Sequence, residues 1–312
     1  MLKNPLILNL LYVLAIGLNI VFLRYFSLHI DALNNNGVRF TVGGLVLFGL
    51  IWLKHRYDFR KLIEKPKLAL IGVLMGVMMC GNMYFWLKGV ALTNAVTASV
   101  SGVLAMPFGI AVAGIFFQDE RQKLKNKTFW FGSLLTILGA LGFVWYGKQI
   151  EVGEYFLLGS FFLLLSILIR NVQNLMVKFV NNQINVFTLS FLTSFTAGIL
   201  SLLFSQQSGK LSELSQISTF LLVSLILVGI YAIGAGMVLT FHVIQQQGII
   251  TYQVLELLMP ISTAFIAYLL LGETISPMQF VFAGIVIVGA SMALNIVPFY
   301  KKSSFNKGSN KQ

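Results

Sequence analysis

Two charged side chains stand inside long apolar runs of the sequence, where charge is costly. Glu256 lies in the stretch TYQVLELLMP, residues 251–260, and Arg170 lies in the apolar run 155–178. An isolated charge in an apolar interior is strongly unfavourable, so such a group pairs or becomes neutral. If both runs are helices, with a rise of 1.5 Å per residue, Glu256 lies about 10 Å from the start of its run at residue 249. Arg170 lies about 12 Å from the end of its run at residue 178, and both of these ends are expected at the same membrane face. We therefore expect the two side chains to face each other, directly or through water.

The expected pair has the chemistry of a reversible binding site. Pairing with Arg170 keeps the Glu256 carboxylate ionised, because an opposite charge close by favours the charged form. Separation of the pair frees the carboxylate for a proton or for a cationic group of a substrate. The alternative is a permanent salt bridge that fixes helix packing.

Further polar side chains inside apolar runs complete the candidate set, since such residues are costly in a membrane and therefore informative. Helical spacing places Tyr252, Gln253 and Glu256 on one stripe of the run 249–271, and Asn174 on the stripe of Arg170. The predicted substrate-binding or coupling residues are Glu256, Arg170, Tyr252, Gln253, Asn19, Asn82, Tyr84 and Asn174. A lone Asn or Ser often serves only helix–helix hydrogen bonding, and this alternative stays open.

Two prolines lie in the middle of apolar runs. Pro107 and Pro260 each remove one backbone hydrogen bond, so we predict that both kink their helices and contribute to gating. Kinking prolines are also common in membrane helices without such a role.

The sequence carries no metal-ligand spacing, no phosphate-binding loop and no nucleophile constellation. We therefore predict no catalytic residues, no metal and no cofactor, which argues against an ATP-driven pump and against an enzyme. The single cysteine, Cys80, excludes an internal disulfide.

Composition indicates that lipid is part of the solvent of this chain. Of its 312 residues, 57% are hydrophobic and 10% are charged, with a mean hydropathy of +0.84. Soluble domains carry about 25% charged residues. The net charge of +12 does not indicate nucleic acid, because the Lys and Arg residues lie in short loops between apolar runs.

The apolar runs predict ten membrane-spanning helices, each near the ~20 residues that a bilayer core requires. They are residues 5–25, 37–54, 67–88, 94–117, 128–146, 155–178, 186–204, 217–241, 249–271 and 277–298. The first run lacks a small-residue cleavage site, so we expect it to be retained. Most Lys and Arg residues fall within 54–67, 118–127 and the tail 299–312, which predicts that both termini are cytoplasmic.

An internal repeat divides the chain into two halves. MPFGIAVAGIFFQDE, which begins at Met106, recurs as MPISTAFIAYLLLGE from Met259, so that Glu120 corresponds to Glu273. RFTVG (39–43) corresponds to SFTAG (194–198), and ILGA (137–140) to IVGA (287–290). Because each half has five spans, the second half enters the membrane upside down. Inverted repeats of this kind are a recurring plan of secondary transporters, although a duplicated scaffold without transport is also conceivable.

These features resemble the drug/metabolite transporter superfamily, in its EamA-type ten-helix form. In each repeat the fourth span carries a proline and ends in an acidic residue, as in IAYLLLGE, and the fifth is rich in glycine, as in GSLLTILGALG. The resemblance implies one five-helix repeat over 5–146, an inverted one over 155–298 and a basic cytoplasmic tail over 299–312. It also implies a central cavity lined by spans one to four and six to nine. The chain departs from the family where an acid often precedes the ninth-span proline, since Met259 stands there.

We therefore expect an all-α integral membrane protein, with ten transmembrane helices as two inverted repeats around a central cavity. The predicted function is secondary active transport of a small organic metabolite by alternating access, with a proton as candidate coupling ion. The substrate is expected to be amino acid-like, cationic or xenobiotic. An intramembrane enzyme or lipid-handling protein is the alternative. The expected partners are the substrate and the lipid bilayer, and the expected location is the cell membrane, which is the inner membrane if the source is bacterial.

Overall fold

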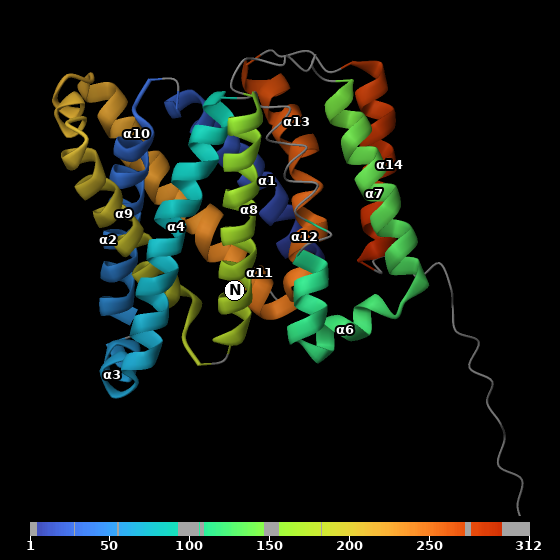
Figure 1. Ribbon diagram of the computed structural model, residues 1–312, viewed down its shortest axis with the longest axis horizontal. Helices are drawn as coiled ribbons and strands as arrows, with labels where there is room; N and C mark the ends of the chain where they lie inside the picture. The colour runs from blue at the N-terminus through green and yellow to red at the C-terminus, as the bar shows by residue number, and fades with distance from the viewer. Residues whose placement is uncertain are drawn as a thin grey trace, which may run out of the picture.

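The computed structural model describes residues 5–27, 29–54, 56–92, 106, 109–146, 156–181, 183–271 and 276–294. Within these ranges every regular element is a helix (Figure 1). Most of the predicted fourth span, Pro107, the segment 272–275 with Glu273 and the tail 299–312 lie outside the described residues.

The helices follow the predicted apolar runs along the chain. In the first half they are α1 (Pro5–Ser27), α2 (Ala32–Lys54), α3 (Arg56–Glu64), α4 (Pro66–Leu92), α6 (Gln118–Leu124) and α7 (Lys127–Trp145). In the second half they are α8 (Phe156–Phe179), α9 (Val186–Gln207), the 3₁₀ turn η1 (Leu211–Ser215), α10 (Thr219–Tyr231), the π-helical segment η2 (Ala232–Val238), α11 (Leu239–Gln247), α12 (Ile249–Glu256), α13 (Met259–Leu271) and α14 (Pro277–Ala293).

The described helices are long and apolar enough for a multi-pass membrane protein. Within the described residues, seven helical stretches reach a membrane-spanning length, and α7 and α14 are shorter apolar helices. The stretch from α10 through η2 to α11 counts as one of the seven. These helices account for every predicted span except the fourth, which falls largely outside the described ranges.

Two predicted boundaries were wrong because polar side chains there bond to residues far away in the sequence. The second span begins at Ala32 rather than 37, and Asn34 accepts a hydrogen bond from Ser205 of α9 at 2.6 Å. The eighth span continues to Gln247 rather than ending at 241, and Gln247 donates to Asn9 of α1 at 2.7 Å. Its end is set by Gly248, whose φ of 91° suits glycine and interrupts the helix.

Contacts between α7 and α14 show the internal repeat in three dimensions. A methyl group added at Gly139 would lie 3.0 Å from the backbone nitrogen of Val286, and one at Gly289 would lie 2.7 Å from that of Thr136. Gly139 corresponds to Gly289 in the repeat, and Thr136 corresponds to Val286 at the same offset. The two contacts are therefore reciprocal, as in an interface formed across a two-fold axis. The two helices lie side by side at one edge of the bundle (Figure 1).

The direction of these contacts shows that the repeats are inverted. Gly132 lies against Ala293, whereas Gly142 lies against Phe282, so α7 and α14 run antiparallel. The corresponding helices α2 and α9 also run antiparallel, since Gly37 lies against Leu202 and Gly44 against Phe195. Equivalent helices of the two halves thus point in opposite directions through the bundle.

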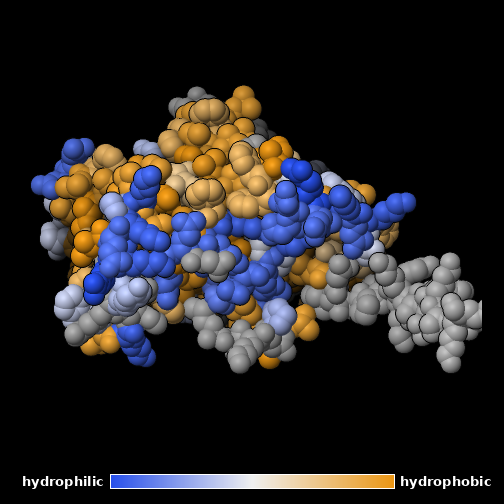
Figure 2. Space-filling model, turned by 90° about the horizontal axis from the view of Figure 1, so that it is seen from below, coloured by the Kyte–Doolittle hydropathy of each residue, from blue (hydrophilic) through white to orange (hydrophobic). Residues whose placement is uncertain are grey.

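One end of the bundle is marked by basic side chains and is called the basic end below. It is the end at which α3 and α6 lie, at the bottom of Figure 1. Hydrophilic residues gather across this face when the molecule is seen from below (Figure 2). Its exposed basic residues include Lys54, Arg60, Lys65, Lys67, Arg121, Lys125 and Lys127.

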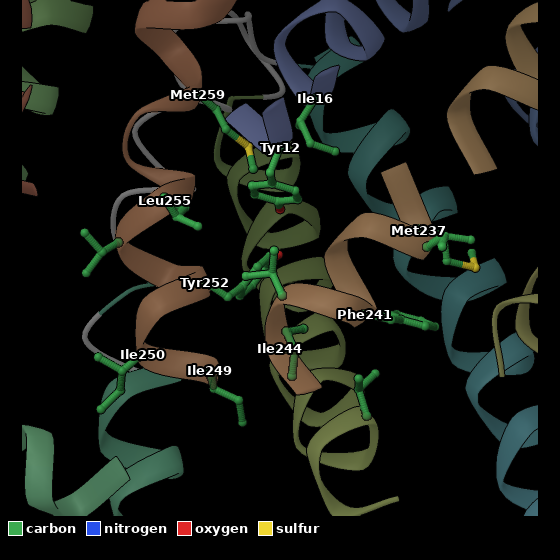
Figure 3. Packing of buried hydrophobic residues seen from close by; sticks show 14 of the residues in the cluster. Tyr12, Ile16, Met237, Phe241, Ile244, Ile249, Ile250, Tyr252, Leu255 and Met259 are labelled. Carbon is green, nitrogen blue, oxygen red and sulfur yellow. The ribbon is translucent and has the colours of Figure 1, made fainter. Parts of the chain in front are cut away.

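The larger buried cluster extends through most of the bundle, and part of it lies where α1, α11 and α12 meet. Tyr12 of α1, Ile244 of α11 and Leu255 of α12 are each at most 1% exposed. Figure 3 shows Tyr12, Tyr252 and Ile244 close to one another between these helices. This packing fixes the position of α12, which carries Tyr252, Gln253 and Glu256.

Candidate functional site

An ion pair between the second-half helices α8 and α12 forms the centre of the candidate site. Nη1 of Arg170 lies 3.0 Å from Oε1 of Glu256. The hydroxyl of Tyr252 donates a hydrogen bond to the same carboxylate oxygen at 2.7 Å. The Arg170 side chain keeps 27% of its surface exposed and that of Glu256 keeps 11%. The contact that we expected from the similar depths of Arg170 and Glu256 in their spans is therefore present, and both side chains are partly exposed.

A break in the ninth span places Glu256 at a helix end. The helix α12 ends at Glu256 and α13 begins at Met259, so the span is interrupted just before Pro260, where the sequence predicts a kink. Proline has no N–H, so the carbonyl of Glu256, four residues earlier, lacks its usual helical partner. Leu257 and Leu258 bond instead to carbonyls three residues back, at 3.2 and 3.1 Å. The ionised side chain thus lies beside irregular backbone, where the two parts of the span are able to tilt against each other.

Tyr12 of α1 adds a first-half side chain to the site. It is 1% exposed, and its ring centroid lies 6.4 Å from that of Tyr252 (Figure 3). Thr240 of α11 donates to the Tyr12 hydroxyl at 3.4 Å. Through Tyr252, the ion pair of α8 and α12 is thus linked to Tyr12 of the first half, which α11 holds in place.

A buried amide pair also joins α12 to α8. Nε2 of Gln253 donates to Oδ1 of Asn171 of α8 at 2.8 Å, and both residues are at most 3% exposed. Any side chain at Gly109 would overlap these two amides, so the backbone at that position approaches them closely. The first half therefore packs against the Gln253–Asn171 pair as well as against the tyrosines.

Helical spacing in the sequence places Ser166, Arg170, Gln173 and Asn174 on one polar stripe of α8, and the structure divides this stripe between two neighbours. Arg170 faces Glu256 of α12, whereas Ser166 donates to Asn82 of α4 at 2.6 Å. Gln173 also donates to α4, at the carbonyl of Met75, with a distance of 3.0 Å. Ser166 and Gln173 thus hold α8 to α4, and Arg170 is the residue of the stripe that is directed to α12.

Within the described residues, no hydrogen bond or ion pair joins Asn19, Tyr84 or Asn174 to the Arg170–Glu256 pair. Asn19 of α1 lies near Gly236 of η2. Tyr84 of α4 stacks edge-on against Phe85, with the Lys88 ammonium 5.9 Å from its ring centroid. Asn174 is 3% exposed, and its Nδ2 has no hydrogen-bond partner among the described residues.

Several buried polar atoms near the centre are unsatisfied. Within the described residues, Oε2 of Glu256, Oε1 of Gln253 and Oγ1 of Thr263 accept no hydrogen bond. Buried polar atoms in proteins are almost always bonded, so these atoms are available to a substrate, a water molecule or a proton. The central cavity itself stays a prediction, because much of the fourth span expected to line it lies outside the described residues.

Sequence reasoning missed Tyr12 and Asn171. Both are polar residues inside apolar stretches, LLYVL and ILIRNV, and this pattern could have marked them as candidates. Asn171 follows Arg170 directly, yet it bonds to Gln253 and not to the residues of the predicted α8 stripe. Among the described residues, no group of three or more His, Cys, Asp or Glu side chains is arranged to hold a metal ion.

A second ion pair lies at the end of the bundle opposite the basic end. Nζ of Lys210, which precedes η1, lies 2.5 Å from Oδ2 of Asp31 at the start of α2. Burial opposes ionisation of Asp31, but the hydrogen bonds from Lys210 and from the Leu33 N–H outweigh it and lower the pKa of the carboxyl. The same hydrogen bond to Asp31 raises the pKa of Lys210. This pair fastens the first half to the second at that end.

Comparison with known proteins agrees with the fold. The EamA-like transporter family matches residues 4–145 and 157–295. An uncharacterized transporter of Haemophilus influenzae is 38% identical over 296 residues, which cover 94% of this chain and 97% of that protein. A protein of known crystal structure superimposes with a TM-score of 0.72 at 14% identity, covering 93% of this chain and 97% of the other. At that identity the likeness shows the fold alone.

The inverted helical repeats, the apolar spans and the family match over both halves lead to one conclusion. The chain is an integral, multi-pass membrane protein that belongs to the EamA-like transporter family.

Proposed function

We propose that this protein is a secondary active transporter that moves a small organic metabolite by alternating access. The observation that carries the proposal is the Arg170–Glu256 pair, which is partly exposed inside the bundle and leaves Oε2 of Glu256 without a partner among the described residues. Ionised groups inside membrane proteins mark substrate and ion pathways, because their burial is otherwise unfavourable.

The geometry supports exchange of partners at Glu256. In the described state Arg170 and Tyr252 both occupy Oε1. A proton or the cationic group of a substrate binds at Oε2 and weakens the attraction between Glu256 and Arg170. An amino acid-like substrate would also offer a carboxylate to Arg170, and a cationic xenobiotic would stack against the rings of Tyr12 and Tyr252. These are the substrate classes that the site fits.

The helix break and the inverted repeat supply the movement. Pro260 lies just after the break at Leu257–Leu258, so α12 is able to change its angle to α13 without disturbing a complete helical hydrogen-bond pattern. Pro107, its equivalent in the first half, is proposed to act in the same way and lies outside the described residues. Two inverted halves that rock about a site between them open it to each side in turn.

The proposed orientation places the basic end in the cytoplasm. Lys and Arg residues on α3 and α6 face that end, and basic residues are enriched in cytoplasmic loops of membrane proteins. Both termini would then lie in the cytoplasm, and the bilayer would be the cell membrane.

A panel of candidate substrates in proteoliposomes tests the proposal. Amino acids, organic cations and amphipathic drugs are supplied on one side, with and without a pH gradient, and unmodified compound is measured on the other. Protein-free liposomes are the control. Appearance of the unchanged compound, dependent on protein, supports transport. Conversion of a compound without its translocation would favour the enzyme or lipid-handling alternative.

A further inference from the structure

Glu120 of α6 is the centre of an ionic cluster at the basic end. It is fully buried, and its Oε1 lies 2.5 Å from Nζ of Lys178 of α8. The same oxygen accepts a hydrogen bond from the backbone N–H of Ile249, the first residue of α12, at 2.6 Å. Nζ of Lys123 lies 3.0 Å from Oε2. One carboxylate of the first half thus binds two helices of the second.

Neighbouring contacts strengthen the connection between the halves. Lys123 also donates to the carbonyl of Gln247 at the end of α11, at 2.7 Å. Gly248, between α11 and α12, has a φ of 91°, and any side chain there would overlap the Glu120 carboxylate. The chain between the two helices is therefore shaped to receive this carboxylate.

The two helices that Glu120 binds are those that carry the central ion pair. In α8, Lys178 follows Arg170 by eight residues, about 12 Å along the axis. In α12, Ile249 and Glu256 are the first and last residues, about 10 Å apart. The helices α8 and α12 are thus joined directly by Arg170–Glu256 and, at the basic end, through Glu120. Movement of α12 away from α8 has to break these two connections and the Gln253–Asn171 hydrogen bond.

The cluster lies at the rim of the bundle, where water is available to the separated charges. Asp119, next to Glu120, is 65% exposed and also pairs with Lys178 at 2.5 Å. Lys123 is 35% exposed. Lys123 belongs to the same helix as Glu120 and stays paired with it when Lys178 leaves, and Asp119 is then solvated. The cluster is therefore able to open without leaving a buried carboxylate unpaired.

We propose that Glu120 is a positioning residue that latches the basic end closed by holding α8 and α12 against α6. Release of Lys178 and of the Ile249 N–H opens this end and lets α12 carry Glu256 away from Arg170. The inference rests on the proposed alternating access, to which it adds the closing contact of one side. A permanent brace that never opens is the competing role.

Thiol labelling of detergent-solubilised protein tests the latch without any substrate. In a Cys80→Ala background, Thr251→Cys places a reporter on α12 beside Lys123, whose ammonium lies 3.4 Å from the Thr251 hydroxyl. A maleimide is expected to label this cysteine slowly in the parent and about tenfold faster or more after Glu120→Gln, because removal of one partner strongly weakens a buried ion pair. Equal rates with and without Glu120→Gln would overturn the proposal.

Glu64→Gln is the matched control. Glu64 also lies at the basic end and pairs with a basic residue, Arg60, at 3.0 Å, but both belong to the exposed helix α3. Its replacement is expected to leave the labelling rate unchanged. A rise equal to that of Glu120→Gln would mean that any lost charge at this end loosens the protein, which would contradict a specific latch.

A second pair of variants keeps the test informative if Glu120→Gln folds poorly. Lys178→Gln is expected to raise labelling to a similar degree. The double variant should show little further increase, because each change removes the same Glu120–Lys178 contact. Fully additive increases would contradict the shared latch. Glu256→Gln in the same reporter background is expected to raise labelling by a smaller factor, since it weakens another connection between α8 and α12 and leaves the Gln253–Asn171 hydrogen bond in place. No change there would disprove the coupling between latch and site.

The latch and the transport proposal fail separately. The labelling experiments contain no substrate, so a negative result leaves transport by Arg170 and Glu256 intact. If the labelling results are as expected but the proteoliposome panel shows no transport, the basic end opens as proposed, and the transport proposal is contradicted.

Discussion

At the scale of single residues, the two carboxylate oxygens of Glu256 have different surroundings. Oε1 receives Arg170 and Tyr252, whereas Oε2 has no partner among the described residues. Its position explains the difference, because α12 ends at Glu256 and the chain turns before α13 begins. A carboxylate that is held by one oxygen and open at the other is suited to exchange ligands without losing its place.

The Asp31–Lys210 pair gives a pH-dependent prediction at this scale. The pKa of Asp31 is lowered from 3.8, so its contribution to stability is present above pH 3.8 and lost as pH falls through the lower folded value. The pKa of Lys210 is raised from 10.5, so its contribution is present below pH 10.5 and lost as pH rises through the higher folded value. Between these limits the pair is complete.

Asp31→Asn is therefore expected to lower the melting temperature in detergent near pH 7. The loss should be small, in keeping with about 1 kcal/mol or less for partly exposed pairs. The difference from the parent should shrink as the pH falls below 3.8, where the parent carboxylate also loses its charge. A difference that persists undiminished at pH 2 would show that the charge of Asp31 is not what stabilises this end.

At the scale of elements, glycines set how closely equivalent helices approach. The contacts of Gly289 with the Thr136 nitrogen and the Gly132 carbonyl oxygen, at 2.7 and 2.8 Å from an added methyl group, leave no room for a side chain. Gly284 lies one and a half turns earlier in α14, and a methyl group there would meet nothing within 4 Å. The same helix thus contains a packed glycine and an unpacked one.

Gly289→Ala is expected to separate α7 from α14 and to lower stability by about 1–3 kcal/mol, the usual cost of overpacking. Gly284→Ala is the control and should leave stability unchanged or slightly higher, since alanine favours a helix over glycine. Thermal unfolding of both variants in detergent measures the difference. Equal melting temperatures would contradict the close reciprocal contact of the two helices.

The helices and their contacts show what the sequence could and could not predict. Spans were predictable because an apolar run of helical length has few alternatives in lipid. The true ends at Ala32 and Gln247 were not predictable. The side-chain amides near them bond to Ser205 and Asn9, which lie far away in sequence. In the site, depth along two spans was enough to predict the contact of Arg170 with Glu256. Depth does not give the rotation of a helix about its axis, which is why Tyr12 and Asn171 were missed.

At the scale of the whole molecule, the two halves are joined at three levels. Asp31–Lys210 connects them at one end, Tyr12 meets Tyr252 near the centre, and Glu120 connects them at the basic end. An alternating-access protein needs contacts at both ends that break in turn, with a site between them. The ion pairs occupy the places where such contacts are required.

The orientation of the whole molecule is testable with two exposed positions. In a Cys80→Ala background, Ser212→Cys lies in η1 and Gln122→Cys lies in α6 at the basic end. A membrane-impermeant maleimide added to intact cells is expected to label the cysteine at 212 and not that at 122, whereas both should react after lysis. Labelling of both from outside, or of 122 alone, would be incompatible with a cytoplasmic basic end.

The central claim is that the Arg170–Glu256 pair binds the substrate or the coupling proton during transport and does not merely hold α8 to α12. Its most direct test compares three proteins in proteoliposomes, with a compound that the substrate panel has identified: the parent, Glu256→Gln, and Glu256→Gln combined with Arg170→Gln. We predict that Glu256→Gln folds and inserts, and that its transport falls at least about tenfold, which corresponds to 1.4 kcal/mol or more, or no longer responds to pH. If Glu256→Gln instead misfolds while the double variant is stable and transports at the parental rate, the pair is structural and the transport site lies elsewhere.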